Sequence, residues 1–270
     1  MLRSLWTAAS GMKSQQLYVD SIAHNLANVN TVGYKKESME FKSLLYETLR
    51  ASGVDENGNG TPVSLQVGHG VRASANVKNF SQGSIETTNN PLDFSIDGDG
   101  FFVIQGLNEE QLYTKDGAFK LSIMEDGIRL TTSDGYAVLN SEGEPIEFDN
   151  TFMPDKLVIS SQGEIGYMTE EGVEDLGTTV AVAQFRNVAG LDAVGGNFYK
   201  ATGASGQAIL EAEDDELKKS NIMQGTLESS NVQVVDEMVK MIIAQRAYEL
   251  NSKAIQTSDD MLGMANNLKR

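Results

Sequence analysis

Two short stretches of the sequence carry carboxylates and amides at spacings that suit a calcium-binding loop. One runs from Asp55 to Gly60 and the other from Asp93 to Gly98. A loop of the EF-hand type also needs a bidentate glutamate at its last position, and these positions hold Gln66 and Ile104. The Asn-Gly pairs of the first stretch and the Asp-Gly pair of the second are typical of tight turns. The sequence therefore predicts no metal site.

Histidine and nucleotide chemistry find equally little support. The glycines around His69 resemble a dinucleotide fingerprint only superficially, because the segment leads into strand-like sequence and not into a helix. Neither His24 nor His69 has a histidine partner four residues on, and the chain contains no G-x-S-x-G nucleophile elbow. A catalytic pair of carboxylates for glycoside hydrolysis remains an alternative, although no local motif indicates which two acidic residues would form it. We expect no enzyme, no catalytic residues and no cofactor.

The composition and net charge of the chain exclude several kinds of site and binding partner. The 270 residues include no cysteine, which excludes disulfides and thiolate metal sites, and their net charge of −17 repels phosphate backbones. No stretch approaches the ~20 apolar residues that cross a bilayer. Polar residues interrupt the first segment before Lys13, so we expect no cleaved secretory signal. Neither nucleic acid nor membrane embedding is expected.

The acidity belongs to the middle of the chain. Residues 51–222 hold ten basic and 28 acidic side chains, all four prolines, and every glycine except Gly11, Gly33, Gly225 and Gly263. Short apolar segments alternate there with Asp-Gly turns, which favours antiparallel strands. The segments are 92–96, 101–105, 118–121, 128–132, 136–139, 157–160, 165–168 and 178–185. This spacing predicts a compact sandwich or barrel-like β unit.

The two ends of the chain carry apolar residues at every seventh position, which predicts amphipathic helices with a coiled-coil-like seam. The N-terminal repeat predicts a helix of roughly 25 residues. The two stripes are narrow, so we expect the terminal helices to pack together or on neighbouring copies of the chain. The candidate assembly interface is Leu5, Met12, Val19, Leu26, Leu227, Val234, Met238, Met241, Ile242, Tyr248, Ile255 and Leu262.

The expected fold class is α+β and elongated. Residues 1–30 and 223–270 are expected to form a terminal α-helical coiled-coil assembly domain. Residues 31–75 and 206–222 are expected to form an extended connecting region, and residues 76–205 a β-rich outer domain.

Motifs at both ends of the chain resemble the signatures of the flagellar axial proteins, the rod and hook family. The stretches Leu2 to Trp6, Gln82 to Asn90 and Gly100 to Phe102 are most similar to the distal rod branch of that family. The matching signature residues are Asn25, Leu26, Ala27, Asn28, Thr31, Gly33, Tyr34, Lys35, Asn231, Gln245, Arg246, Ala247, Tyr248 and Asn251.

The resemblance implies a structural subunit that assembles into a helical tube, the drive shaft that carries motor torque to the hook. It implies an inner coiled-coil domain, an outer β domain, and a region at about 31–75 that stiffens the rod. The implied location is the extracytoplasmic basal body, reached through the flagellar type III export apparatus without signal cleavage. The implied partners are other copies of the chain, proximal rod proteins, the hook protein and the basal body rings.

Two alternatives stay open. A proximal rod or hook member of the same family would differ in residues 35–75, and its position beside or away from the rings would distinguish it. From a different class, an oligomeric β-sandwich enzyme or adhesin would associate through its terminal helices. Turnover of a glycan by the purified protein would favour that class.

Overall fold

The fold is described from a computed structural model of the chain. The structure describes residues 2–50, 52–54, 60–61, 63–106, 109–124, 127–149, 153–169, 172–212 and 218–267. Most of the first calcium-like stretch, residues 55–59, lies outside the described residues.

The chain divides into two compact units, each built from separate parts of the sequence. The helical unit comprises Met1–Ala27, Glu37–Val77 and Gln233–Arg270, and the β unit comprises Asn28–Lys36 and Lys78–Val232. This division differs from the expected boundaries. Residues 37–75, expected as part of the connecting region, lie with the helices. Residues 28–36 and 206–232, expected as parts of the connecting region and the helical domain, lie with the β unit.

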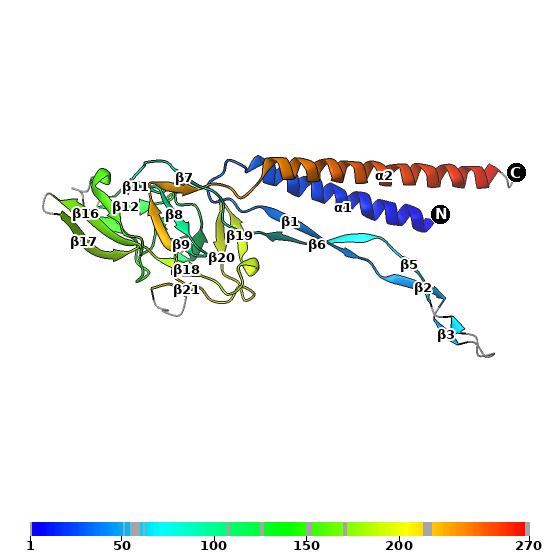
Figure 1. Cartoon of the computed structure of the whole chain (residues 1–270), viewed down its shortest axis with the longest axis horizontal. Coiled ribbons are helices and arrows are strands. Elements are labelled where there is room, and N and C mark those ends of the chain that lie inside the picture. The colour runs from blue at the N-terminus through cyan, green and yellow to red at the C-terminus, as the bar shows by residue number, and fades with distance from the viewer. Residues whose placement is uncertain are drawn as a thin grey trace. The chain divides into compact units, whose positions relative to one another are not determined.

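The helical unit contains two long helices that run side by side, α1 (Leu2–Ala27) and α2 (Val234–Asn267) (Figure 1). A two-stranded ribbon accompanies them, made of three successive strand pairs. These are β1 (Glu37–Ser43) with β6 (Val71–Lys78), β2 (Tyr46–Arg50) with β5 (Leu65–Gly68), and β3 (Gly53–Val54) with β4 (Gly60–Thr61). The ring of Tyr18 on α1 meets that of Phe41 on β1 edge to face at 5.6 Å, which joins helix and ribbon.

Small and polar side chains line the contact between α1 and α2. Ala8 on α1 and Ala244 on α2 are buried, and the hydroxyls of Ser4 and Ser258 lie 3.0 Å apart. A Cβ at Gly11 would lie 2.8 Å from Nδ2 of Asn251, so the glycine permits the close approach of the helices at this level.

The β unit is built from antiparallel strand pairs. Its largest sheet has ten strands, with β11-β12-β13-β9-β10-β20-β19 in order, β14 beside β12, and β18 beside β9 and β21. A three-stranded sheet holds β15-β16-β17, and two further pairs are β22-β8 and β23-β7. The strands are β7 (Ile85–Thr87), β8 (Phe94–Asp97), β9 (Phe101–Gln105), β10 (Gln111–Thr114), β11 (Lys120–Ile123), β12 (Ile128–Thr131), β13 (Ala137–Val138), β14 (Glu147–Phe148), β15 (Leu157–Ile159), β16 (Glu164–Thr169), β17 (Gly172–Thr179), β18 (Val182–Gln184), β19 (Asp192–Gly195), β20 (Phe198–Lys200), β21 (Ile209–Leu210), β22 (Asn221–Gln224) and β23 (Thr226–Glu228), and the short 3-10 turns are η2 (Pro154–Lys156) and η3 (Val188–Gly190).

Alternation of apolar side chains along these strands produces the core. Residues of β9 point in turn into two buried clusters: Phe102 and Ile104 into one, Phe101 and Val103 into the other. The β-rich character predicted for the middle of the chain is confirmed. The segment 178–185 is divided between β17 and β18, with Val180 bridged to Asn140.

Candidate assembly surface

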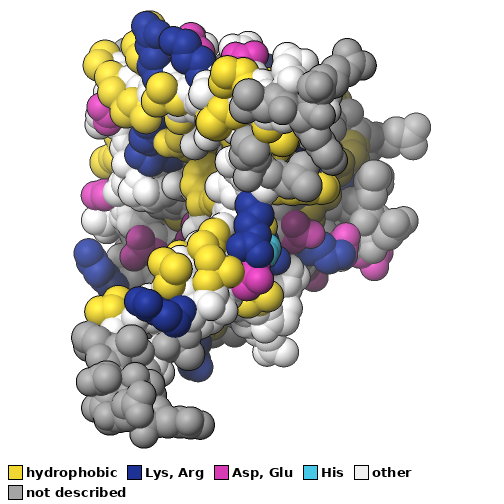
Figure 2. All heavy atoms as spheres, turned by 90° about the vertical axis from the view of Figure 1, so that its right-hand side faces the viewer, with side chains coloured by type: hydrophobic (Ala, Val, Ile, Leu, Met, Phe, Trp, Pro, Cys, Tyr) yellow, Lys and Arg dark blue, Asp and Glu magenta, His cyan; other side chains and the backbone are white. Residues whose placement is uncertain are grey.

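The first three turns of α2 carry six large apolar side chains that are open to solvent. Their exposed fractions lie between 39% and 73%. They form two neighbouring stripes, one of Val234, Met238 and Ile242 and the other of Val235, Val239 and Ile243. Figure 2 shows hydrophobic side chains open on the surface of the molecule, beside Lys and Arg.

The opposite side of these turns already has a partner. Glu237 and Ala244 are buried there, on the side of α2 that faces α1. Apolar side chains cover about half of the circumference at the start of α2, and Asp236, Glu237 and Lys240 occupy the other side. So broad an exposed apolar face is typical of a helix that another surface covers. Asp236 and Glu237 stabilise this start through the helix dipole. The exposed stripes are therefore a surface that lacks a partner within the described part of the chain.

The structure separates the interface residues expected from the sequence into three groups. Val234, Met238, Ile242 and Tyr248 are exposed on α2. Leu227 is not on a helix, because the chain turns at Gly225 with a φ of +71° and then enters β23. Partly buried within the helical unit are Leu5, Met12, Val19, Leu26, Met241, Ile255 and Leu262.

The predicted interface leaves out several exposed apolar residues of α2, and three of them lie in its first turns: Val235, Val239 and Ile243. Their signal is adjacency, because Val234-Val235, Met238-Val239 and Ile242-Ile243 are consecutive apolar pairs. A pair of neighbours on a helix points in two directions about 100° apart, so three such pairs create a second stripe.

Asn25 joins three elements of the helical unit. Its Nδ2 donates to the carbonyl of Glu37 on β1 at 2.8 Å, and the amide of Glu37 donates to its Oδ1 at 2.8 Å. The same Nδ2 lies 3.2 Å from Oε2 of Glu237 on α2. Lys240 donates to Oε1 of that buried glutamate at 2.6 Å, and this hydrogen bond raises the pKa of Lys240. A single signature residue thus fixes α1 against both α2 and the ribbon.

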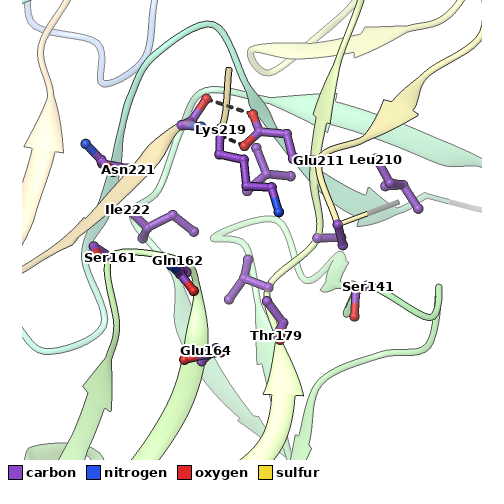
Figure 3. Close-up of a pocket in the computed structure, with 15 residues that line it drawn as sticks. Ser141, Ser161, Gln162, Glu164, Thr179, Leu210, Glu211, Lys219, Asn221 and Ile222 are labelled. Carbon is purple, nitrogen blue, oxygen red and sulfur yellow. Dashed lines mark hydrogen bonds between the residues drawn. The ribbon is translucent and has the colours of Figure 1, made fainter. Parts of the chain in front are cut away.

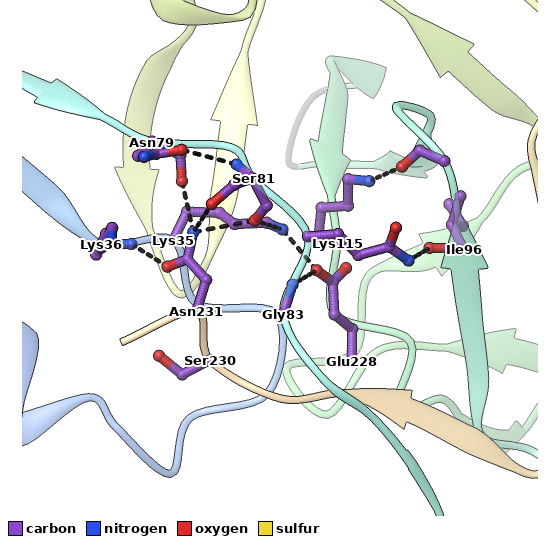
Figure 4. Close-up of polar contacts among 12 residues, drawn as sticks. Lys35, Lys36, Asn79, Ser81, Gly83, Ile96, Lys115, Glu228, Ser230 and Asn231 are labelled. Atoms are coloured by element: carbon purple, nitrogen blue, oxygen red, sulfur yellow. Dashed lines mark hydrogen bonds and ion pairs between the residues drawn. The ribbon is translucent and has the colours of Figure 1, made fainter. Parts of the chain in front are cut away.

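Lys35 and Glu228 form a buried ion pair in the β unit (Figure 4). Nζ of Lys35 lies 2.6 Å from Oε1 of Glu228 and donates to the carbonyl of Ser81 at 3.0 Å. The amide of Gly83 donates to the same Oε1 at 2.7 Å, while Oε2 of Glu228 is buried without a hydrogen-bond partner among the described residues. Both side chains are 1% exposed, so each charge depends on the other for solvation.

Asn231 completes this node. Its Oδ1 accepts the amide of Lys36 at 2.8 Å, and its Nδ2 donates to the carbonyls of Asn79 and Ser81 at 2.8 and 3.0 Å. The residues that the two signatures contribute to the β unit therefore bind one another through segments almost two hundred positions apart in the sequence.

A second buried lysine stands near the pair. Nζ of Lys115 donates to the carbonyl of Gly98 at 2.7 Å and lies 5.2 Å from the centre of the Phe101 ring. Burial lowers the pKa of Lys115 to about 8, against an opposing attraction from Glu228. Burial of the charged Lys115 ammonium therefore costs folding free energy.

The other signature residues hold turns or lie on the helix surface. Gly33 adopts a φ of +66°, and a Cβ there would meet the backbone amide of Asp116 at 2.7 Å. Thr31 donates to Oδ1 of Asn28 at 3.1 Å. Tyr34 is buried, with Nζ of Lys78 at 5.4 Å from its ring centre. On α2, Gln245 and Arg246 are exposed, Ala247 is partly buried, and Asn251 lies against Gly11. Leu26 and Ala27 end α1.

The β unit also contains a cavity of about 350 Å³ beside β22 (Figure 3). The carboxylate of Glu211 forms part of its wall and accepts the amide and hydroxyl of Ser220, each at 2.7 Å, and Nε2 of Gln184 at 2.8 Å. Both carboxylate oxygens are thus engaged in fixing the wall. Among the described residues no group of three or more His, Cys, Asp or Glu side chains is placed to hold a metal ion, and no helix is long and apolar enough to cross a membrane.

Three regions of the chain match family models. Residues 5–35 match the flagella basal body rod protein family, residues 95–167 match the flagellar hook protein FlgE/F/G D1 domain, and residues 223–268 match the C-terminal region of the flagellar basal body rod FlgEFG proteins.

Full-length relatives match as well. The flagellar basal-body rod protein FlgG of Borreliella burgdorferi is 45% identical over 273 residues, covering 100% of both chains. FlgG of Caulobacter vibrioides is 38% identical, covering 99% of this chain and 100% of its own. FlgG of Bacillus subtilis is 36% identical, covering 100% of both.

Proposed function

The chain belongs to the flagellar basal-body rod protein family, whose members are structural proteins and not enzymes, and from this premise we propose that it is a subunit of the distal rod. In this proposal, copies of the chain assemble into a helical tube that transmits motor torque to the hook. Membership of this family excludes the alternative of an unrelated enzyme or adhesin.

The exposed apolar stripes of α2 carry the proposal. Two stripes on adjacent sides of one helix favour contacts with two different neighbours. Contacts between unlike surfaces do not close on themselves unless the rotation happens to close a ring, so they build an open helical polymer. In this proposal α1 and α2, which run side by side, are the coiled-coil-like pair that each copy contributes.

The distal position is supported by the resemblance of the residues between the two signatures. In this position the proximal rod proteins, the hook protein and the basal body rings are the neighbours. Export through the flagellar type III apparatus would leave α1 in the mature protein, in keeping with its contacts to α2 and β1 in the helical unit.

Labelling of isolated basal bodies tests the position. An antibody against the β unit, applied to hook-basal bodies from the source bacterium, is expected to mark the rod segment next to the hook. Label at the inner end of the rod, or along the hook, would favour the proximal rod or hook alternative.

A further inference from the structure

Methionine is the only side chain through which this protein has reversible sulfur chemistry. The chain contains 11 methionines and no cysteine. Oxidation of a methionine converts a flexible apolar thioether into a polar sulfoxide, and methionine sulfoxide reductases reverse the change. The effect on a protein depends on where the oxidised side chain lies.

Met238 combines accessibility with a position inside the assembly surface. Its side chain is 52% exposed, and it stands between Val234 and Ile242 in the first apolar stripe. Met261 and Met264 are exposed too, but polar residues lie beside or near them in sequence: Asp260 directly precedes Met261, and Asn266 lies two positions after Met264. Met241 is partly buried. A polar group added at Met238 therefore enters the most apolar part of the helix.

We propose that Met238 is a reversible oxidation site, at which a peroxide blocks the docking of a second copy of the chain. The proposal rests on the proposed function, since it needs the α2 surface to be an interface between copies. Docking buries the side chain, so the unassembled subunit is the sensitive form and the polymer is protected.

The chemistry balances without a cofactor. The sulfur lone pair attacks one of the two equivalent oxygens of hydrogen peroxide, and the O–O bond breaks as the S–O bond forms. The proton of the attacked oxygen passes to the departing hydroxide, which leaves as water. In the reverse step two thiols of the reductase supply two electrons and two protons, the oxygen leaves as water, and the thiols become a disulfide. Burying the unpartnered sulfoxide is expected to raise the critical concentration for assembly roughly tenfold or more.

Met168 on β16 is a matched control. It has the same 52% exposure as Met238 but belongs to the β unit, outside the stripes. Leucine keeps an apolar side chain but has no sulfur to oxidise, so Met238→Leu and Met168→Leu each remove one oxidation site. The assembly of each variant after peroxide is compared with its own assembly before peroxide, and Met168→Leu is expected to assemble as the parent does.

The experiment treats the full-length, unassembled chain with graded hydrogen peroxide, measures the sulfoxide at each methionine by peptide mass spectrometry, and follows assembly by sedimentation. The parent chain and Met168→Leu are expected to lose assembly in proportion to sulfoxide at Met238, and methionine sulfoxide reductase is expected to restore it. Met238→Leu is expected to assemble after the same treatment, with Met168 fully oxidised.

Two results would overturn the proposal: normal assembly of the parent chain with Met238 oxidised, or equal loss of assembly in Met238→Leu. Failure of the untreated parent chain to assemble would instead refute the proposed function, and this proposal with it. Oxidising preassembled polymer gives a second measurement, in which sulfoxide is expected at Met168 and not at Met238.

Discussion

Replacing Ile242 with aspartate probes the assembly surface at the C-terminal end of its first stripe. Ile242 is 57% exposed in the helical unit, and this exposed share of its side chain is what a second copy can still cover. Full burial of an isoleucine contributes about 1.5–3 kcal/mol, and the share still available here is about 1–2 kcal/mol. An ionised aspartate enclosed without a partner adds several kcal/mol to the cost of assembly.

The combined loss of about 3 kcal/mol or more corresponds to a critical concentration at least ~100 times higher. The unassembled chain is affected far less, because the position is largely in water and aspartate costs only about 0.7 kcal/mol in helix propensity. Sedimentation of purified chain over a concentration series measures assembly, and thermal unfolding measures stability.

Gln256→Asp is the control for Ile242→Asp, since it places the same charge on an exposed polar position of the same helix. We expect it to assemble close to normally. Normal assembly of Ile242→Asp would show that the stripe is a solvent face. Unfolding of the unassembled Ile242→Asp chain would show that the stripe is internal core. Either result would contradict an interface between copies at this stripe.

Three further predictions concern the β unit. The pKa of Lys115 is about 8 in the folded state against an ordinary 10.5, so the folded state binds fewer protons than the unfolded state between these values. The free energy of unfolding should therefore rise by up to ~3 kcal/mol from pH 8 to pH 10.5. Chemical denaturation across this range measures the rise, which should be absent in Lys115→Met. Glu228→Gln should lower the free energy of unfolding by about 3–5 kcal/mol, because it leaves the buried charge of Lys35 without its partner. Combining it with Lys35→Met should recover part of the lost stability in urea titrations. A double variant less stable than either single variant would contradict the pairing. Gly33→Ala should cost about 1–3 kcal/mol, because its φ of +66° and the nearby amide of Asp116 leave no room for a Cβ; an unchanged melting temperature would contradict this.

The sequence predicted the kinds of elements well, because their signals are local. Apolar residues at helical spacing predicted α1, and apolar runs separated by turn residues predicted about half of the strands of the β unit. The repeat that extends back to Leu227 was misleading, since Gly225 and the pairing of β23 with β7 decide the structure there. Sequence spacing does not report whether a distant strand competes for a segment.

Burial and partnership were less predictable. Lys35 was recognised as a signature residue, but its partner Glu228 lies 193 positions away and no local pattern connects them. The sequence also did not show which of the expected interface residues are exposed and which are partly buried, because burial depends on contacts with distant segments. Met241 is at the centre of the repeat yet is partly buried in the helical unit, whereas its neighbour Ile242 is exposed, and only the position of α1 decides between them.

A helical reconstruction of the assembled polymer by electron cryo-microscopy would show which side chains of α2 lie between copies of the chain. We expect Val234, Met238 and Ile242 to contact one neighbouring copy and Val235, Val239 and Ile243 to contact another. A map in which these side chains face water, inside or outside the tube, would contradict this expectation.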